Sequence, residues 1–131
     1  MPLLVAFGAG NVGRGFIGEL FSTAGWDVAF LDVDPRLVER LGEDRSYIHE
    51  TVSNSGALRR VVTRITAAYS TDQHAVDALV TDADLVVSAT GVRHTITASQ
   101  LEQMRQDTVV AVIGGVEQEV AMTDAEAAGA R

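Results

Sequence analysis

An unbroken apolar run, Leu3–Phe7, leads directly into the glycine spacing G-x-G-x-x-G, and this junction constrains the fold more than any other part of the chain. A short apolar run that ends at glycine predicts a strand buried on both faces, as in parallel sheets. Apolar residues then recur at helical spacing up to Gly25, which predicts a helix with a glycine C-cap. A strand, a glycine-rich turn and a helix in this order predict a turn that cradles phosphate groups.

The residues of the motif have separate expected roles. Gly8 permits the tight turn after the strand, and Gly10 lets the backbone approach a pyrophosphate. Gly13 lets the helix pack closely against the strand, with Asn11 and Val12 between the last two glycines. The alternative is a glycine-rich turn between strand and helix that holds no ligand.

A second apolar run, Val28–Leu31, closes on Asp32, which stands 19 residues after Gly13. An acid at the end of the second strand accepts hydrogen bonds from the ribose hydroxyls of an adenosine. Asp32 would repel the additional 2′-phosphate of NADP, so the sequence favours NAD as the cofactor. Asp34 competes for this role, but it is better explained as a helix cap. Arg36 lies close enough to a 2′-phosphate to keep NADP open as an alternative.

The remaining pattern alternates strands and helices, with one β-hairpin inserted. It predicts an α/β doubly wound parallel sheet, which is a single dinucleotide-binding (Rossmann) domain over residues 1–131. The later elements are expected as follows: a helix capped by Asp34 and ended by Gly42, a hairpin turning at 53–56, a strand at 65–69, a helix opened by a capping box at 70–73, a strand at 84–90, a short helix at 97–105 and a strand at 109–113.

The expected fourth strand ends in small residues, Ala89, Thr90 and Gly91. In open α/β sheets a ligand lies at the carboxyl ends of the strands, where the strand order reverses. Small residues there would let the nicotinamide half of a dinucleotide pass close to the backbone. A simple turn between strand and helix explains each residue equally well, and the same alternatives apply to Gly114 and Gly115.

Composition excludes several classes of function. The formal net charge is −8 without a basic stripe, so neither nucleic acid nor an anionic membrane surface is an expected partner. No apolar run approaches the length of a membrane span, no signal peptide is recognisable, and a cytoplasmic location is expected. Cysteine is absent and the three histidines lack metal-ligand spacing, so no metal site is expected. All ten basic residues are arginine, which leaves no lysine for catalysis.

The glycine-rich stretch extends beyond the general motif and resembles the N-terminal signature of the mannitol dehydrogenase family, most of all its mannitol-1-phosphate 5-dehydrogenase branch. The resemblance is specific because it includes Asn11 and the run 14–18, which other dinucleotide-binding turns lack. It fades after about Gly91. The stretches that carry it are FGAGNVGRGFIGEL from Phe7, FLDVD from Phe30, RSYIHE from Arg45 and DLVVSATG from Asp84.

The resemblance implies an enzyme that oxidises a polyol or polyol phosphate by hydride transfer to a nicotinamide cofactor. Enzymes of this family have a second, mostly helical domain whose lysine, asparagine and histidine carry out catalysis. This chain has no lysine, and we expect that catalytic domain to be absent from it, so no residue here is assigned a catalytic role. The family's cofactor-binding residues carry over to Gly8, Gly10, Asn11, Val12, Gly13 and Asp32.

The expected function is therefore the NAD(H)-binding half of a polyol-phosphate dehydrogenase, whose partners are a dinucleotide and the missing catalytic domain. Two alternatives remain from the sequence. One is a stand-alone nucleotide-sensing regulatory domain, which would expose an apolar dimer face. The other is a remnant of a longer enzyme. The exact polyol and the oligomeric state stay open, and a homo-oligomer is compatible with the sequence.

Overall fold

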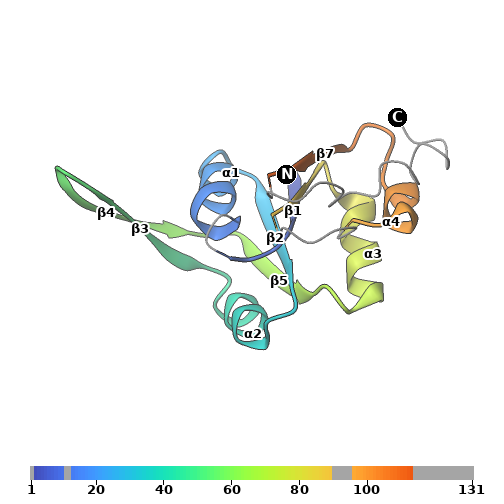
Figure 1. The fold of residues 1–131 in the computed structure, drawn as a ribbon, viewed down its shortest axis with the longest axis horizontal. Helices are drawn as coiled ribbons and strands as arrows, with labels where there is room; N and C mark the ends of the chain where they lie inside the picture. Colours follow the sequence, from blue (N-terminus) through green and yellow to red (C-terminus); the bar gives the residue numbers. More distant parts are fainter. Residues whose placement is uncertain (1, 11–12, 90–95, 114–131) are drawn as a thin grey trace.

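The computed structural model describes residues 2–10, 13–89 and 96–113, which form a five-stranded sheet, flanking helices and a separate hairpin (Figure 1). The strand order is β5-β2-β1-β6-β7, and all neighbouring strands are parallel. The order reverses between β1 and β6, which confirms the predicted doubly wound sheet. The strands are β1 (Leu3–Phe7), β2 (Asp27–Asp32), β5 (Ile65–Tyr69), β6 (Leu85–Ser88) and β7 (Val109–Val112).

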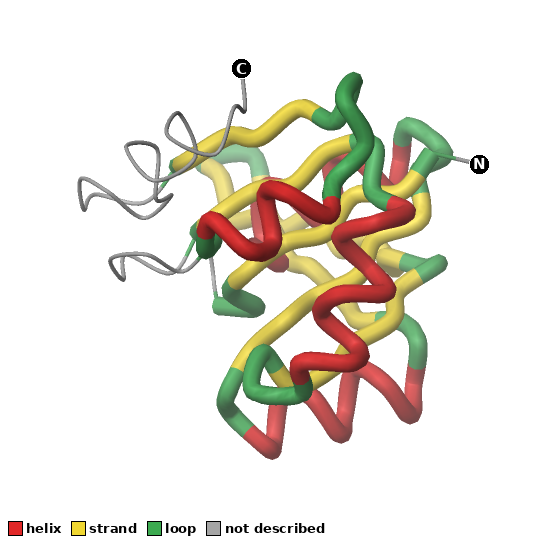
Figure 2. The backbone as a smooth tube through the Cα atoms, turned by 90° about the vertical axis from the view of Figure 1, so that its right-hand side faces the viewer, coloured by secondary structure: helices red, strands yellow, loops and turns green. Residues whose placement is uncertain are grey.

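Alternate side chains of the central strands feed two separate cores. Leu4 and Phe30 lie in one core, beneath a π-helix η1 (Gly13–Gly18), α1 (Glu19–Thr23) and α2 (Pro35–Asp44). Phe7 and Leu31 lie in the other, beneath α3 (Gln73–Asp82) and α4 (Ala98–Gln103), which face the viewer in Figure 2. Each fully buried side chain of this size contributes about 1.5–3 kcal/mol. The two cores explain why β1 and β2 are apolar at every position between their ends.

Two helix ends differ from the sequence expectation. Gly42 lies inside α2, which runs on to a left-handed C-cap at Arg45, with φ 55°. The expected capping box at 70–73 is wrong, because Asp72 caps α3 by accepting the Ala75 N–H. A capping box does form at α4, where Thr97 and Gln100 bond each other's backbone.

The predicted hairpin is present as β3 (Tyr47–Ser53) and β4 (Gly56–Val62), and it projects away from the parallel sheet (Figure 1). Its base is held against the body, since Val62 is buried and Tyr47 is half-buried. Most of its remaining length is exposed on both faces. A two-stranded hairpin has little stability alone in water, so its contacts with the body at the base fix its position.

Candidate functional site

The glycine-rich turn lies at the carboxyl end of β1, between the ends of β2 and β6. Gly8 has a φ of 107°, a conformation that favours glycine, and its N–H donates to the Leu31 carbonyl oxygen at 2.7 Å. The chain therefore turns sharply at the edge of the sheet while it remains bonded to β2. This geometry agrees with the role predicted for the first glycine.

The other two glycines of the motif differ in the space around them. A Cβ at Gly13 would overlap the Gly8 carbonyl oxygen, because η1 packs directly against the turn. A Cβ at Gly10 would meet no atom within 4 Å, and Gly10 itself is exposed. Gly13 is thus required by the protein's own packing, whereas Gly10 opens toward solvent. The predicted contacts of Asn11 and Val12 lie outside the described residues.

Asp32 is bonded to the turn itself. Its Oδ2 accepts the Ala9 N–H at 2.8 Å, and its Oδ1 accepts the N–H groups of Val33 at 2.7 Å and Asp34 at 3.0 Å. Among the described residues no arginine or histidine forms an ion pair with this carboxylate. A carboxylate offers about four acceptor positions, so Asp32 keeps acceptor capacity for a hydroxyl group.

The two residues that follow Asp32, Val33 and Asp34, differ in role. Asp34 caps α2 as expected, because its Oδ1 accepts the Arg36 N–H at 2.9 Å. The Arg36 guanidinium pairs with Asp34 at 3.8 Å and is almost fully exposed. Sequence reasoning did not single out Val33, which is 66% exposed beside Asp32. Its position directly after the acid is the sequence feature that could have identified it.

The end of β6 meets the same turn. The Ala89 N–H donates to the Phe7 carbonyl oxygen at 2.8 Å, and Ser88 before it is buried. Ala89 therefore lies beside the end of β1, where the predicted nicotinamide path would run. Thr90 and Gly91 lie outside the described residues, as do Gly114 and Gly115.

The hairpin base contacts η1 and α1, which sequence reasoning missed. The Tyr47 hydroxyl donates to the Arg14 carbonyl oxygen, and the His49 ring contacts the Glu19 carboxylate. A Cβ at Gly18 would overlap the Tyr47 hydroxyl. The sequence signal for this packing is the presence of Gly15 and Gly18, because neither glycine belongs to the phosphate-turn motif.

An open groove of about 960 Å³ lies between α2 and η1, and Tyr47 is one of the residues that line it. Three arginines line it, and Asp34 and Asp44 reduce their net charge. The arginines are Arg14, Arg36 and Arg40. The Nε of Arg14 is buried without a hydrogen-bond partner among the described residues. Since Arg36 pairs with Asp34 and Arg40 pairs with Asp44, the charged residues that line the groove leave a net charge of +1 next to the carboxyl edge of β2.

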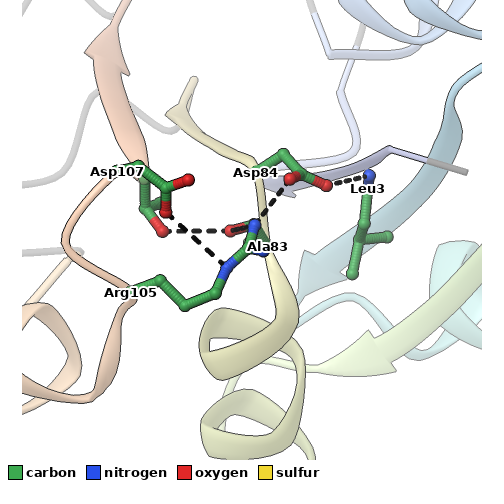
Figure 3. Close-up of polar contacts among 6 residues, drawn as sticks. Leu3, Ala83, Asp84, Arg105 and Asp107 are labelled. Carbon is green, nitrogen blue, oxygen red and sulfur yellow. Dashed lines mark hydrogen bonds and ion pairs between the residues drawn. The ribbon is translucent and has the colours of Figure 1, made fainter.

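A second polar cluster lies at the opposite, amino edge of the sheet (Figure 3). Asp84 accepts the Leu3 N–H at 2.8 Å and pairs with the Arg105 guanidinium at 2.5 Å. Arg105 and Thr108 also donate to the Ala83 carbonyl oxygen, each at 3.0 Å. The Leu3 N–H bond, followed by Arg105, lowers the pKa of Asp84. These contacts tie β1, β6 and the start of β7 together.

Within residues 2–10, 13–89 and 96–113, no group of three or more histidine, aspartate or glutamate side chains is arranged to hold a metal ion. In the same part of the chain, no helix is both long and apolar enough to cross a membrane.

Comparison with known proteins gives matches in family and in fold. Residues 2–125 match the family model described as the mannitol dehydrogenase Rossmann domain. Mannitol-1-phosphate 5-dehydrogenase of Brevibacillus brevis is 43% identical over 89 residues, which are 68% of this chain and 23% of that protein. The enzyme of the same name from Halalkalibacterium halodurans is 41% identical over 88 residues, 66% of this chain and 23% of the relative. The chain therefore spans about a quarter of the length of these curated relatives.

Solved structures share the fold at low sequence identity. One chain of a dipicolinate synthase from Bacillus halodurans matches 99% of this chain and 36% of its own length, with a TM-score of 0.72 and 16% identity. A D-isomer specific 2-hydroxyacid dehydrogenase from Xanthobacter autotrophicus Py2, in complex with NADPH and MES, matches 97% of this chain and 43% of its own, with a TM-score of 0.61 and 14% identity. These matches support the architecture alone.

Proposed function

This chain belongs to the mannitol dehydrogenase Rossmann-domain family, and we propose that it binds the NAD(H) of a polyol-phosphate dehydrogenase. The observation that carries the proposal is the bond between Asp32 and the Ala9 N–H. It places an acid suited to ribose hydroxyls beside the turn suited to a pyrophosphate. Because no described cation pairs with Asp32, its charge is available to a ligand.

The residues at the carboxyl edge fit the parts of a dinucleotide in sequence. We assign the ribose hydroxyls of the adenosine to Asp32 and one face of the adenine to the exposed Val33. We assign the pyrophosphate to Gly10, Asn11, Val12 and Gly13, because a glycine-rich turn that leads into a helix offers backbone N–H groups to phosphates. The nicotinamide half follows Ala89, Thr90 and Gly91 toward the end of β6.

The chemistry divides between this domain and the rest of the enzyme. A bound nicotinamide cofactor would supply the hydride acceptor for oxidation of the carbinol carbon of the polyol phosphate. The residues of this chain hold the cofactor and orient it toward the substrate. The absence of lysine from the chain supports a base supplied from outside it. In this proposal the part of the relatives beyond the matched quarter binds the polyol phosphate and removes the hydroxyl proton.

Ligand-dependent thermal stability tests this function. We expect NAD⁺ to raise the melting midpoint of the 131-residue chain, because a ligand that binds only the folded state stabilises it by about 2.7 kcal/mol at 100 times its Kd. ATP serves as the control nucleotide. No shift at millimolar NAD⁺ would contradict the cofactor assignment. Robust oxidation of mannitol 1-phosphate by this chain alone would contradict the division of labour.

NADP(H) is the second candidate cofactor, and the groove between η1 and α2 is what favours it. Arg14 and Arg36 line this groove next to the α2 cap, and an arginine near the second strand accommodates a 2′-phosphate in some dinucleotide-binding domains. Asp32 and Asp34 oppose it by charge repulsion. An NADP⁺ arm in the same titration decides between the two, and we expect the smaller shift with NADP⁺.

A further inference from the structure

We propose that Tyr47 is a positioning residue for the dinucleotide turn, acting from the base of the hairpin on the helix that follows the turn. The inference rests on the proposed function, because it concerns how the pyrophosphate end of the same site is held. It also assigns a role to the glycines of the family signature that lie beyond G-x-G-x-x-G.

The contact of Tyr47 is made one residue after the phosphate-turn motif ends. Its hydroxyl donates to the carbonyl oxygen of Arg14, which directly follows Gly13. The ring meets Phe30 of β2 edge-on, with centroids 6.2 Å apart at 61°. Burial raises the pKa of Tyr47, so the hydroxyl keeps its proton and remains a donor at neutral pH. Tyr47 thus links β2, the hairpin and the start of η1.

Two glycines make room for the hairpin base. A Cβ at Gly18 would overlap both the Tyr47 hydroxyl and the Phe30 ring. A Cβ at Gly15 would lie 3.2 Å from Nε2 of His49, which is closer than most side chains tolerate. Both glycines face the hairpin base, and neither belongs to the G-x-G-x-x-G motif. The signature run 14–18 therefore forms the seat of the hairpin on the dinucleotide helix.

Further contacts attach the hairpin farther along the helix. Glu19 contacts His49 and pairs with Arg60 at 3.4 Å, so one carboxylate receives a side chain from each hairpin strand. The Ser22 hydroxyl donates to the Thr63 carbonyl oxygen at 2.7 Å, just beyond β4. These bonds hold the body of the helix. Among them, Tyr47 lies nearest to the turn, so its loss acts on the N-terminal end of η1.

The consequence is selective for part of the ligand. η1 packs through Gly13 against the glycine-rich turn to which we assign the pyrophosphate, whereas the residues assigned to the adenosine, Asp32 and Val33, lie at the end of β2. Loosening η1 should therefore raise the Kd for ligands that carry a pyrophosphate and leave the Kd for adenosine unchanged. A general loss of stability would not separate the two ligands in this way.

The test is an NMR titration of the full 131-residue chain with ADP-ribose and with adenosine. Tyr47→Phe keeps the ring and removes the hydroxyl, and we expect the Kd for ADP-ribose to rise about three- to tenfold while that for adenosine stays constant. Tyr69→Phe is the matched control, since its hydroxyl donates to Glu39 at 3.3 Å on the exposed surface. The control should bind both ligands as the wild type does.

The outcomes separate the two proposals. If the wild-type chain binds neither NAD⁺ nor ADP-ribose, the proposed function fails and this inference fails with it. If the wild type binds but Tyr47→Phe leaves the ratio of the two Kd values unchanged, the positioning role is overturned while the proposed function stands. An equal rise in the Kd values for ADP-ribose and adenosine also overturns the positioning role. Thermal melts show whether each variant is folded at the titration temperature.

Discussion

Strand β1 has an aspartate bonded near each of its ends, and the two aspartates differ in what else they contact. At the amino end Asp84 accepts the Leu3 N–H and is paired with Arg105. At the carboxyl end Asp32 accepts the Ala9 N–H, and no described cation pairs with it. The same backbone contact thus occurs once in a cluster neutralised by the protein and once in a cluster that keeps its charge.

The difference teaches which edge is built for a ligand. A carboxylate that is already paired with an arginine holds strands together, and little of its charge or acceptor capacity remains for a ligand. Asp32 accepts three backbone N–H groups but pairs with no described cation, so its negative charge remains available to a ligand beside the open glycine turn. We therefore assign the amino edge to stability and the carboxyl edge to binding. The following predictions test that assignment.

The largest effect is expected at the glycine turn. Gly13→Ala places a Cβ against the Gly8 carbonyl oxygen, and we expect the free energy of unfolding to fall by about 3 kcal/mol in urea titrations. Gly10→Ala is the matched variant, because its Cβ meets no protein atom within 4 Å. It should leave stability unchanged within about 0.5 kcal/mol and weaken NAD⁺ at least tenfold. Equal stability losses in both variants would contradict the description of the turn.

The next effect is on cofactor choice. Asp32→Asn keeps an oxygen to accept the Ala9 N–H but removes the negative charge that disfavours a 2′-phosphate. We expect the ratio of the NADP⁺ Kd to the NAD⁺ Kd to fall about tenfold, which corresponds to about 1.4 kcal/mol. Isothermal titration calorimetry with both dinucleotides measures it. An unchanged ratio would mean that Asp32 does not face the ribose.

A smaller effect distinguishes Asp32 from its neighbour. Asp34→Ala removes the N-cap of α2, which accepts the Arg36 N–H at 2.9 Å. We expect a loss of about 1 kcal/mol in unfolding free energy and an unaltered Kd for NAD⁺. Chemical denaturation and calorimetry on the same sample measure both quantities. If the free energy of NAD⁺ binding falls by more than the free energy of unfolding does, Asp34 is the ribose acid instead.

The smallest effect is expected at the amino edge, where Asp84 and Arg105 are accessible to solvent. The pKa of Asp84 is lowered in the folded chain, so its contribution to stability is present above the ordinary aspartate pKa. That contribution is lost as the pH falls through the lowered pKa of the folded state. Melting midpoints from neutral to acidic pH should therefore fall less steeply in Asp84→Asn than in the wild type. Identical acid slopes would contradict the contribution of Asp84.

The sequence predicted the parts of the molecule that local chemistry determines. Apolar runs ending in glycine or aspartate located β1 and β2, and a Ser-Asn-Ser-Gly turn located the hairpin. The prediction that Gly42 ends α2 was wrong, because the helix packs against β5 and continues past this glycine. The site was less accessible, since the contacts of Tyr47 with Arg14 and Gly18 join residues about thirty positions apart. Only the folded chain brings such residues together.

The most direct test compares the two aspartates in one experiment. NAD⁺ is titrated calorimetrically into the wild type, Asp32→Asn and Asp84→Asn, and the melting midpoint of each is recorded without ligand. We expect Asp84→Asn to melt at a lower temperature and to bind NAD⁺ with the wild-type Kd. Asp32→Asn should bind NAD⁺ about tenfold more weakly. Equal weakening of NAD⁺ by both substitutions would contradict the separation of a binding edge from a structural edge.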